Sequence, residues 1–107
     1  MSIIQYSKLV RDRIPEIIEA GGKRCICSTL SDEEYLAKLD EKLNEELAEY
    51  QESKSMEELA DLLEVMRAVA AARGSSIDEV EDIRQDKAAK RGGFEKKILL
   101  TEVITED

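Results

Sequence analysis

Apolar side chains recur along most of the chain at the three- and four-residue spacing of amphipathic helices. This periodicity predicts helices over residues of about 12–20, 32–52, 56–73 and 77–91. A Ser-x-x-Glu capping box, in which the serine hydroxyl can accept a hydrogen bond from a first-turn amide, precedes each of the last three. The boxes are Ser31/Glu34, Ser55/Glu58 and Ser76/Glu79. Glycines stand where the first, third and fourth helices should end.

Two stretches have an extended pattern instead. Residues 24–30 and 94–104 fit an edge pair or hairpin better than a full sheet, because the second alternates only in part between apolar and polar side chains. We find no internal repeat, low-complexity segment or linker. The sequence therefore predicts one mainly α domain over residues 1–107, an antiparallel helical bundle with a small β appendage near 24–30 and 94–104.

The long second helix places its glutamates at different depths. On a helical wheel, an apolar stripe runs from Leu36 to Tyr50. Glu46 falls at the edge of this stripe and Glu49 on its flank, so the two can act together near the core. Glu45 falls almost opposite the stripe, and we expect it to look outward.

The next helix is apolar from residue 59 to residue 72, except at Asp61, Glu64 and Arg67. A helix this apolar should be buried on several sides, within the bundle or at a subunit interface. A carboxylate in such a helix is costly unless it is paired or binds a metal. Glu58 and Asp61 stand three residues apart in its first two turns.

The short connection between these helices predicts antiparallel packing, which would bring the four carboxylates of Glu46, Glu49, Glu58 and Asp61 together. Such a cluster repels itself unless a cation neutralises it. Because the chain has no histidine, oxygen ligands point to Mg²⁺, with Mn²⁺ as an alternative, rather than to zinc. A competing explanation for Glu58 is its role in the capping box.

Basic residues near the ends of the chain could meet an anionic substrate. Lys87 and Arg91 continue the apolar stripe of the last helix, so that an inward sector turns basic. The alternative is that these cations interact with the helix C-terminus. Lys8 and Arg11 offer further cations near the start of the chain.

Composition limits the partners and the location. A net charge of −9 argues against binding to a nucleic-acid polymer. We find no signal peptide and no apolar run long enough for a membrane, so we expect a cytoplasmic protein. Cys25 and Cys27 are expected to be reduced packing residues, because a disulfide across one residue would be strained.

The spacing Glu45-Glu46-x-x-Glu49 followed by Glu58-x-x-Asp61 resembles the signature of the MazG-like, all-α nucleoside triphosphate pyrophosphohydrolases. Residues 8–15, 59–65 and 87–94 resemble a short, single-domain branch described as phosphoribosyl-ATP pyrophosphohydrolase-like. The resemblance runs from about Tyr6 to Leu100.

This resemblance implies an enzyme that cleaves the α–β phosphoanhydride of a nucleoside triphosphate or related nucleotide, releasing a monophosphate and pyrophosphate. It implies that a homodimer or homotetramer forms and that Mg²⁺ is the cofactor. The implied metal ligands are Glu46, Glu49, Glu58 and Asp61, with Glu46 and Glu49 acting in catalysis through a metal-bound water. Substrate phosphates would be bound by Lys87, Arg91, Lys8 and Arg11.

Only eight residues separate Glu49 from Glu58, fewer than in larger members of that family. The longer connection in those proteins helps to shape the nucleotide pocket. A second hypothesis therefore stays open, in which the chain is a non-catalytic helical module that keeps the family fold and binds a nucleotide or a protein.

Overall fold

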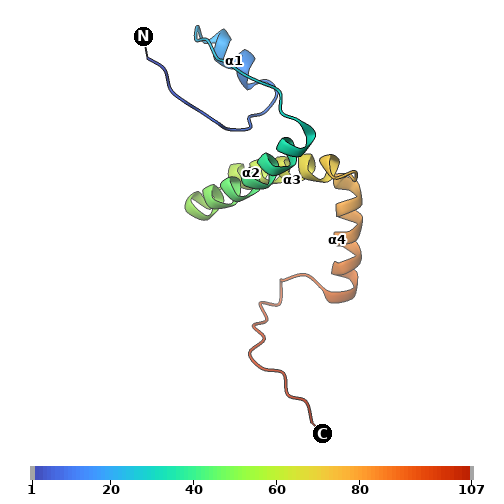
Figure 1. Ribbon diagram of the computed structural model, residues 1–107. Helices are drawn as coiled ribbons and strands as arrows, with labels where there is room; N and C mark the ends of the chain where they lie inside the picture. The colour runs from blue at the N-terminus through green and yellow to red at the C-terminus, as the bar shows by residue number, and fades with distance from the viewer. Residues whose placement is uncertain (1, 107) are drawn as a thin grey trace. The chain divides into compact units, whose positions relative to one another are not determined.

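The computed structural model of the chain describes residues 2–106 and is built from helices (Figure 1). These are α1 (Ile14–Ala20), α2 (Asp32–Ser53), α3 (Met56–Ala72) and α4 (Ile77–Arg91). The mainly α fold is confirmed, and each helix lies within two residues of its predicted bounds. The chain divides into two compact units, Met1–Ile77 and Asp78–Asp107, which we describe separately.

The capping boxes that begin α2 and α3 differ in one respect that bears on the site. At α2 the box is complete: Ser31 Oγ accepts from the Glu34 amide at 3.2 Å, and Glu34 Oε1 accepts from the Ser31 amide at 3.2 Å. At α3, Ser55 Oγ accepts from the Glu58 amide at 3.3 Å, but the Ser55 amide donates to Ser53 Oγ at 3.2 Å. The Glu58 carboxylate is therefore not engaged in capping, which removes the competing explanation for it.

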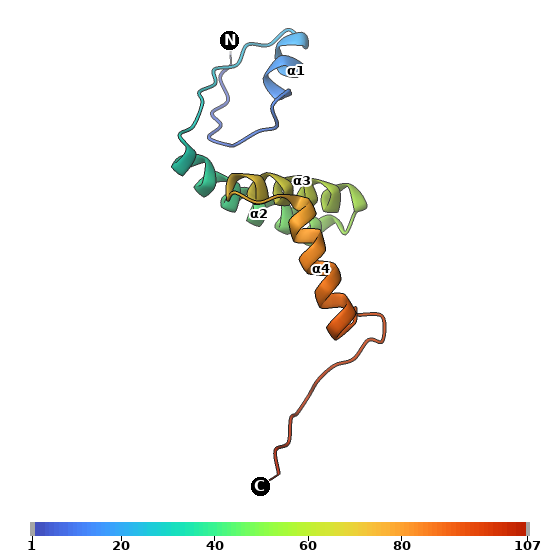
Figure 2. The ribbon, with the colours of Figure 1, turned by 90° about the vertical axis from the view of Figure 1, so that its right-hand side faces the viewer.

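The packed centre of the first unit is the antiparallel pair of α2 and α3, which lie side by side in both views (Figures 1 and 2). The turn between them is two residues long, and Lys54 adopts the left-handed conformation there with φ 58°. Leu39, Val65 and Ala70 form the small apolar core. Because the turn is so short, the last turns of α2 lie beside the first turns of α3.

The sequence analysis expected α3 to be buried on several sides, but within residues 2–77 it is not. This helix packs on α2, while Leu59, Leu63 and Met66 stay between 37% and 51% exposed. An apolar face of α3 is therefore uncovered by residues 2–77. Among residues 2–106, none of the helices combines the length and the apolar character needed to span a bilayer.

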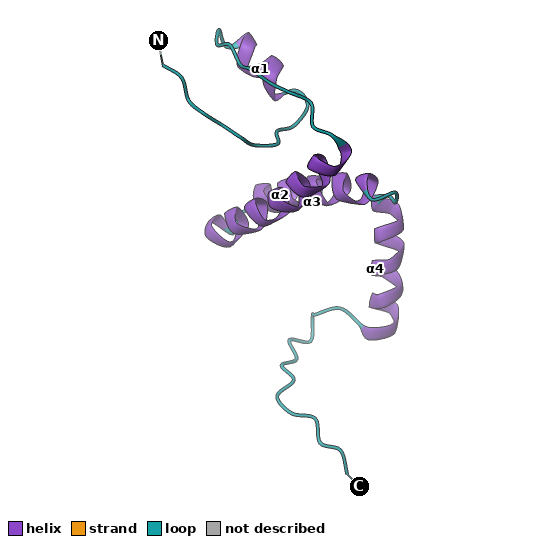
Figure 3. Cartoon of the chain, viewed as in Figure 1, coloured by secondary structure: helices purple, strands orange, loops and turns teal. Residues whose placement is uncertain are grey.

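The expected β appendage does not form within residues 2–106, which contain helices, turns and loops (Figure 3). Residues 24–30 and 94–104 lie outside the helices without pairing in a ladder. An extended segment becomes a strand only when a second segment satisfies its N–H and C=O groups. The apolar side chains of both segments, such as Ile26 and Leu99, are exposed.

Both cysteines are free thiols, but Cys27 is exposed, so the packing role expected of Cys27 is not seen. Cys25 is half-buried, and its burial, followed by the hydrogen bond with Cys27, raises the pKa of its thiol to about 11. A thiol with this pKa stays protonated at neutral pH, which suits a packing role rather than a reactive one.

We predict that Lys54→Gly stabilises the protein. A lysine in the left-handed region is strained by its Cβ, whereas glycine is not, so the free energy of unfolding should rise by about 0.5–1 kcal/mol. Urea denaturation followed by circular dichroism measures the change. Lys38→Gly, inside α2, is the control and should lower stability by about 0.5–1 kcal/mol. Equal or lower stability of Lys54→Gly would contradict the prediction.

Candidate metal centre

Three carboxylates meet where the end of α2 lies beside the start of α3. Glu46 comes from α2, and Glu58 and Asp61 come from α3. Each can offer one oxygen so that the three oxygens lie within 4.8 Å of one another. The antiparallel pair thus brings together three of the four predicted metal ligands.

Glu46 is the most telling of the three. Among residues 2–106, Glu46 is the one charged residue that is buried, with 7% of its surface exposed. Its Oε1 lies 3.6 Å from Lys42 Nζ, while its Oε2 is buried without a hydrogen-bond partner. Glu58 Oε2 is buried and unbonded in the same way. Buried carboxylate oxygens without partners are costly, and a cation shared by Glu46 and Glu58 would compensate that cost.

The electrostatics point in the same direction. Burial raises the pKa of Glu46, and the nearby Glu49 carboxylate raises it further. Burial and then Glu49 also raise the pKa of Glu58. Both effects disfavour ionisation, and a bound cation would oppose them. An all-oxygen set of donors fits a hard divalent ion such as Mg²⁺ or Mn²⁺.

Glu49, the fourth predicted ligand, has a different position. Its side chain is exposed, and it does not join the group formed by Glu46, Glu58 and Asp61. Its effect on the pKa of Glu46 and Glu58 nevertheless places its charge beside them. Its role as a ligand stays a prediction.

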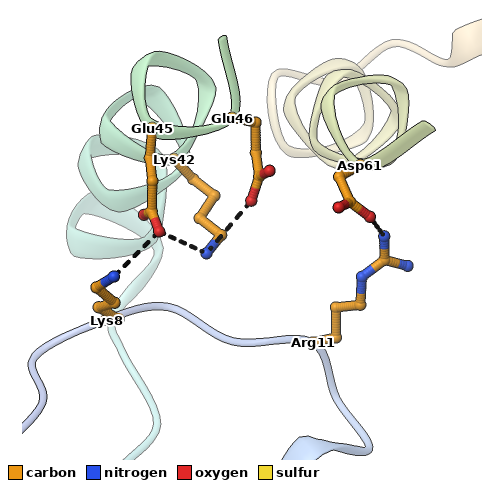
Figure 4. A network of polar contacts seen from close by, with 6 residues as sticks. All are labelled: Lys8, Arg11, Lys42, Glu45, Glu46 and Asp61. Carbon is orange, nitrogen blue, oxygen red and sulfur yellow. Dashed lines mark hydrogen bonds and ion pairs between the residues drawn. The ribbon is translucent and has the colours of Figure 1, made fainter. Parts of the chain in front are cut away.

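The N-terminal segment carries two of the predicted phosphate-binding cations to this centre (Figure 4). Lys8 Nζ donates to Glu45 Oε1 at 3.1 Å, and Arg11 Nη2 donates to Asp61 Oδ1 at 2.8 Å. Both cations pair with carboxylates, so in this state of the protein each is already neutralised.

Glu45 does not look freely outward, and this part of the helical-wheel expectation is wrong. Its side chain is 29% exposed and contacts both Lys8 and, at 3.5 Å, Lys42. The hydrogen bond from Lys8 is the main cause of the lowered pKa of Glu45. The wheel considered only α2, whereas the residues that cover Glu45 come partly from the N-terminal segment.

Lys42 is the residue of the centre that the sequence analysis missed. It lies one turn before Glu45 and Glu46 and contacts both carboxylates (Figure 4). Its spacing of three and four residues from them is the spacing of helical ion pairs, which is the signal that could have identified it.

The other two predicted phosphate-binding residues, Lys87 and Arg91, are exposed on α4 in the second compact unit. The expected inward basic stripe is not seen within that unit, since α4 contains no buried residue. Their contact with a substrate stays a prediction.

A cavity of about 630 Å³ adjoins the carboxylates, between residues 9–13 and the helices α2 and α3. Glu46, Asp61, Lys42 and Arg11 line it, and so do apolar side chains such as Leu39 and Val65. This volume is typical of a small-molecule site, and its wall combines charged and apolar parts.

We predict that Glu46→Gln stabilises the metal-free protein at high pH. A carboxyl whose pKa is raised by folding stabilises the fold below its unfolded pKa, and this contribution is lost as pH rises through the folded pKa. Removing the charge should therefore raise the free energy of unfolding at pH 8, by on the order of 1 kcal/mol, and change it little at pH 4.

Denaturant titrations at both pH values, with a chelator present, would measure this difference. Glu57→Gln removes an exposed carboxylate from the first turn of α3 and serves as the control. The prediction fails if Glu46→Gln is less stable than the unaltered protein at pH 8, or if the two variants behave alike.

Comparison with known proteins gives one local similarity. The chain is 60% identical over 43 residues to an uncharacterized protein of Mycolicibacterium smegmatis. The matched part covers 40% of this chain and 44% of that relative. No family model matches the chain, and no solved structure matches it.

Proposed function

We propose that this protein is a Mg²⁺-dependent nucleotide pyrophosphohydrolase, with Mn²⁺ as an alternative metal. Its reaction would cleave the α–β phosphoanhydride of a nucleoside triphosphate or related nucleotide. The observation that carries the proposal is the buried Glu46 carboxylate, which has one unbonded oxygen and can share a cation with Glu58 and Asp61. The motif resemblance to MazG-like pyrophosphohydrolases supports the choice of reaction.

In this proposal Glu46, Glu58 and Asp61 hold the metal, with Glu49 beside them as the fourth candidate. The ion, when bound, screens the phosphates and increases the acidity of water. The exposed Glu49 carboxylate can orient the attacking water and accept its proton. A bond then forms from the water oxygen to the α-phosphorus, the α–β bridge breaks, and pyrophosphate leaves.

The surroundings of the carboxylates suit a nucleotide. Arg11 and Lys42 line the same cavity as Glu46 and can stabilise negative charge that develops on phosphate oxygens. The apolar part of the wall, with Leu39 and Val65, can contact the remainder of the molecule. Lys8 pairs with Glu45 and does not line the cavity. We propose Lys8, Lys87 and Arg91 as further phosphate contacts.

The uncovered apolar face of α3 supports a homodimer or homotetramer. Leu59, Leu63 and Met66 lie along the helix that also carries Glu58 and Asp61. Association of two copies through this face would remove apolar surface from water. A metal-binding helix would then also be the helix that holds the copies together.

The test is a nucleotide panel assayed for pyrophosphate with Mg²⁺ and with Mn²⁺. We expect pyrophosphate rather than orthophosphate from at least one nucleotide. Glu46→Gln and Asp61→Asn should each lower turnover by about 100-fold or more, since loss of a direct ligand exceeds the effect of losing its supporting contacts. The exposed neighbour variant Glu57→Gln should keep its activity.

Circular dichroism would verify that every variant keeps its helices. Retained turnover in both Glu46→Gln and Asp61→Asn would contradict the assignment of the site. Nucleotide binding by calorimetry without release of pyrophosphate from any member of the panel would instead support the non-catalytic binding module.

A further inference from the structure

Arg11 pairs with Asp61, one of the three carboxylates of the candidate metal centre, and partly neutralises their charge. We propose that Arg11 and the divalent cation compete for Asp61, and that the released guanidinium then binds the anionic part of the ligand. Arg11 would thus oppose binding of the metal alone and favour binding of the metal together with a polyphosphate. This inference rests on the proposed function, because it takes the three carboxylates to be the metal site.

The contact between Arg11 and Asp61 is direct. Arg11 Nη2 lies 2.8 Å from Asp61 Oδ1, and Asp61 is one of the three residues that can share a cation (Figure 4). A guanidinium in this position occupies one of the two oxygens of a required ligand. Its positive charge, a few ångströms from the group, also repels a divalent cation. Metal binding is therefore favoured when Arg11 leaves.

Breaking the ion pair between Arg11 and Asp61 costs the protein little stability. The side chains of Arg11 and Asp61 are 60% and 42% exposed, and ion pairs this exposed contribute little to stability. Arg11 also lies outside the helices, in the loop that precedes α1. Its side chain can turn away from Asp61 without breaking a helix.

Lys42 differs from Arg11 in this respect. It is fixed on α2 and contacts Glu45 at 3.5 Å as well as Glu46 at 3.6 Å. When Glu46 binds a cation, Lys42 keeps Glu45 as its partner. Within residues 2–106, Arg11 forms its ion pair with Asp61 alone, so Arg11 is the cation that needs a new partner.

An anionic ligand can supply that partner. Arg11 lines the cavity together with Glu46 and Asp61, so its guanidinium remains at the site after it leaves Asp61. A guanidinium binds phosphate oxygens with two parallel hydrogen bonds, which a single carboxylate oxygen does not offer. Because linkage is reciprocal, the ligand that holds Arg11 away from Asp61 also strengthens metal binding.

The experiment measures the two affinities separately by isothermal titration calorimetry. For Mn²⁺ alone, Arg11→Met should bind about two- to fivefold more tightly than the unaltered protein, because one competing ion pair is removed. For inorganic tripolyphosphate added with saturating Mn²⁺, Arg11→Met should bind about tenfold more weakly, because a charged hydrogen-bond donor is lost. A merely structural role would not move the two affinities in opposite directions.

Two further variants sharpen the test. Arg73→Met removes another exposed Arg–Asp hydrogen bond, to Asp40 at 3.1 Å, and should change neither affinity. Arg11→Lys keeps the charge, so it should leave Mn²⁺ affinity near that of the unaltered protein and recover part of the tripolyphosphate affinity.

Equal Mn²⁺ affinity of Arg11→Met and the unaltered protein would overturn the exchange while leaving the metal site in place. Tripolyphosphate binding that is unchanged or tighter in Arg11→Met would also overturn it. Absence of specific Mn²⁺ binding in every folded variant would overturn both the exchange and the proposed function.

Discussion

The two-residue turn between α2 and α3 is the constraint on which the rest of the structure depends. It makes the helices antiparallel and sets the end of one beside the start of the other. The same packing that buries Leu39 against α3 also withdraws the Glu46 carboxylate from water. Core formation therefore also assembles the acidic group. The energetic cost of burying the Glu46 charge reduces the stability that is gained by packing α2 against α3.

Much of this arrangement is predictable because it is local. The capping boxes and apolar spacing locate the helices, and the short connection fixes the direction of α3 relative to α2. Burial of Glu46 and the approach of Glu58 and Asp61 then follow. Lys42 was missed although its contacts with Glu45 and Glu46 are local, whereas the other missed feature depends on a distant part of the chain. The contact of Lys8 with Glu45 spans 37 residues, and no periodicity within one helix encodes it.

The β prediction failed for a related reason. Residues 24–30 and 94–104 have a composition that suits extended chain, but a strand is defined by its neighbour. Sequence patterns describe one segment at a time, so they identify segments that could pair without identifying the pair.

The carboxylate group has a consequence for the order in which the protein acquires its parts. Glu46, Glu58 and Asp61 fall within sixteen consecutive residues, whereas the guanidinium that neutralises Asp61 lies 50 residues away. Contacts that are close in sequence close small loops and form early during folding. The nascent hairpin thus presents its acidic group to the solvent before Arg11 reaches it. During that interval Lys42, on the same helix as Glu46, and dissolved cations are the positive charges available to these carboxylates.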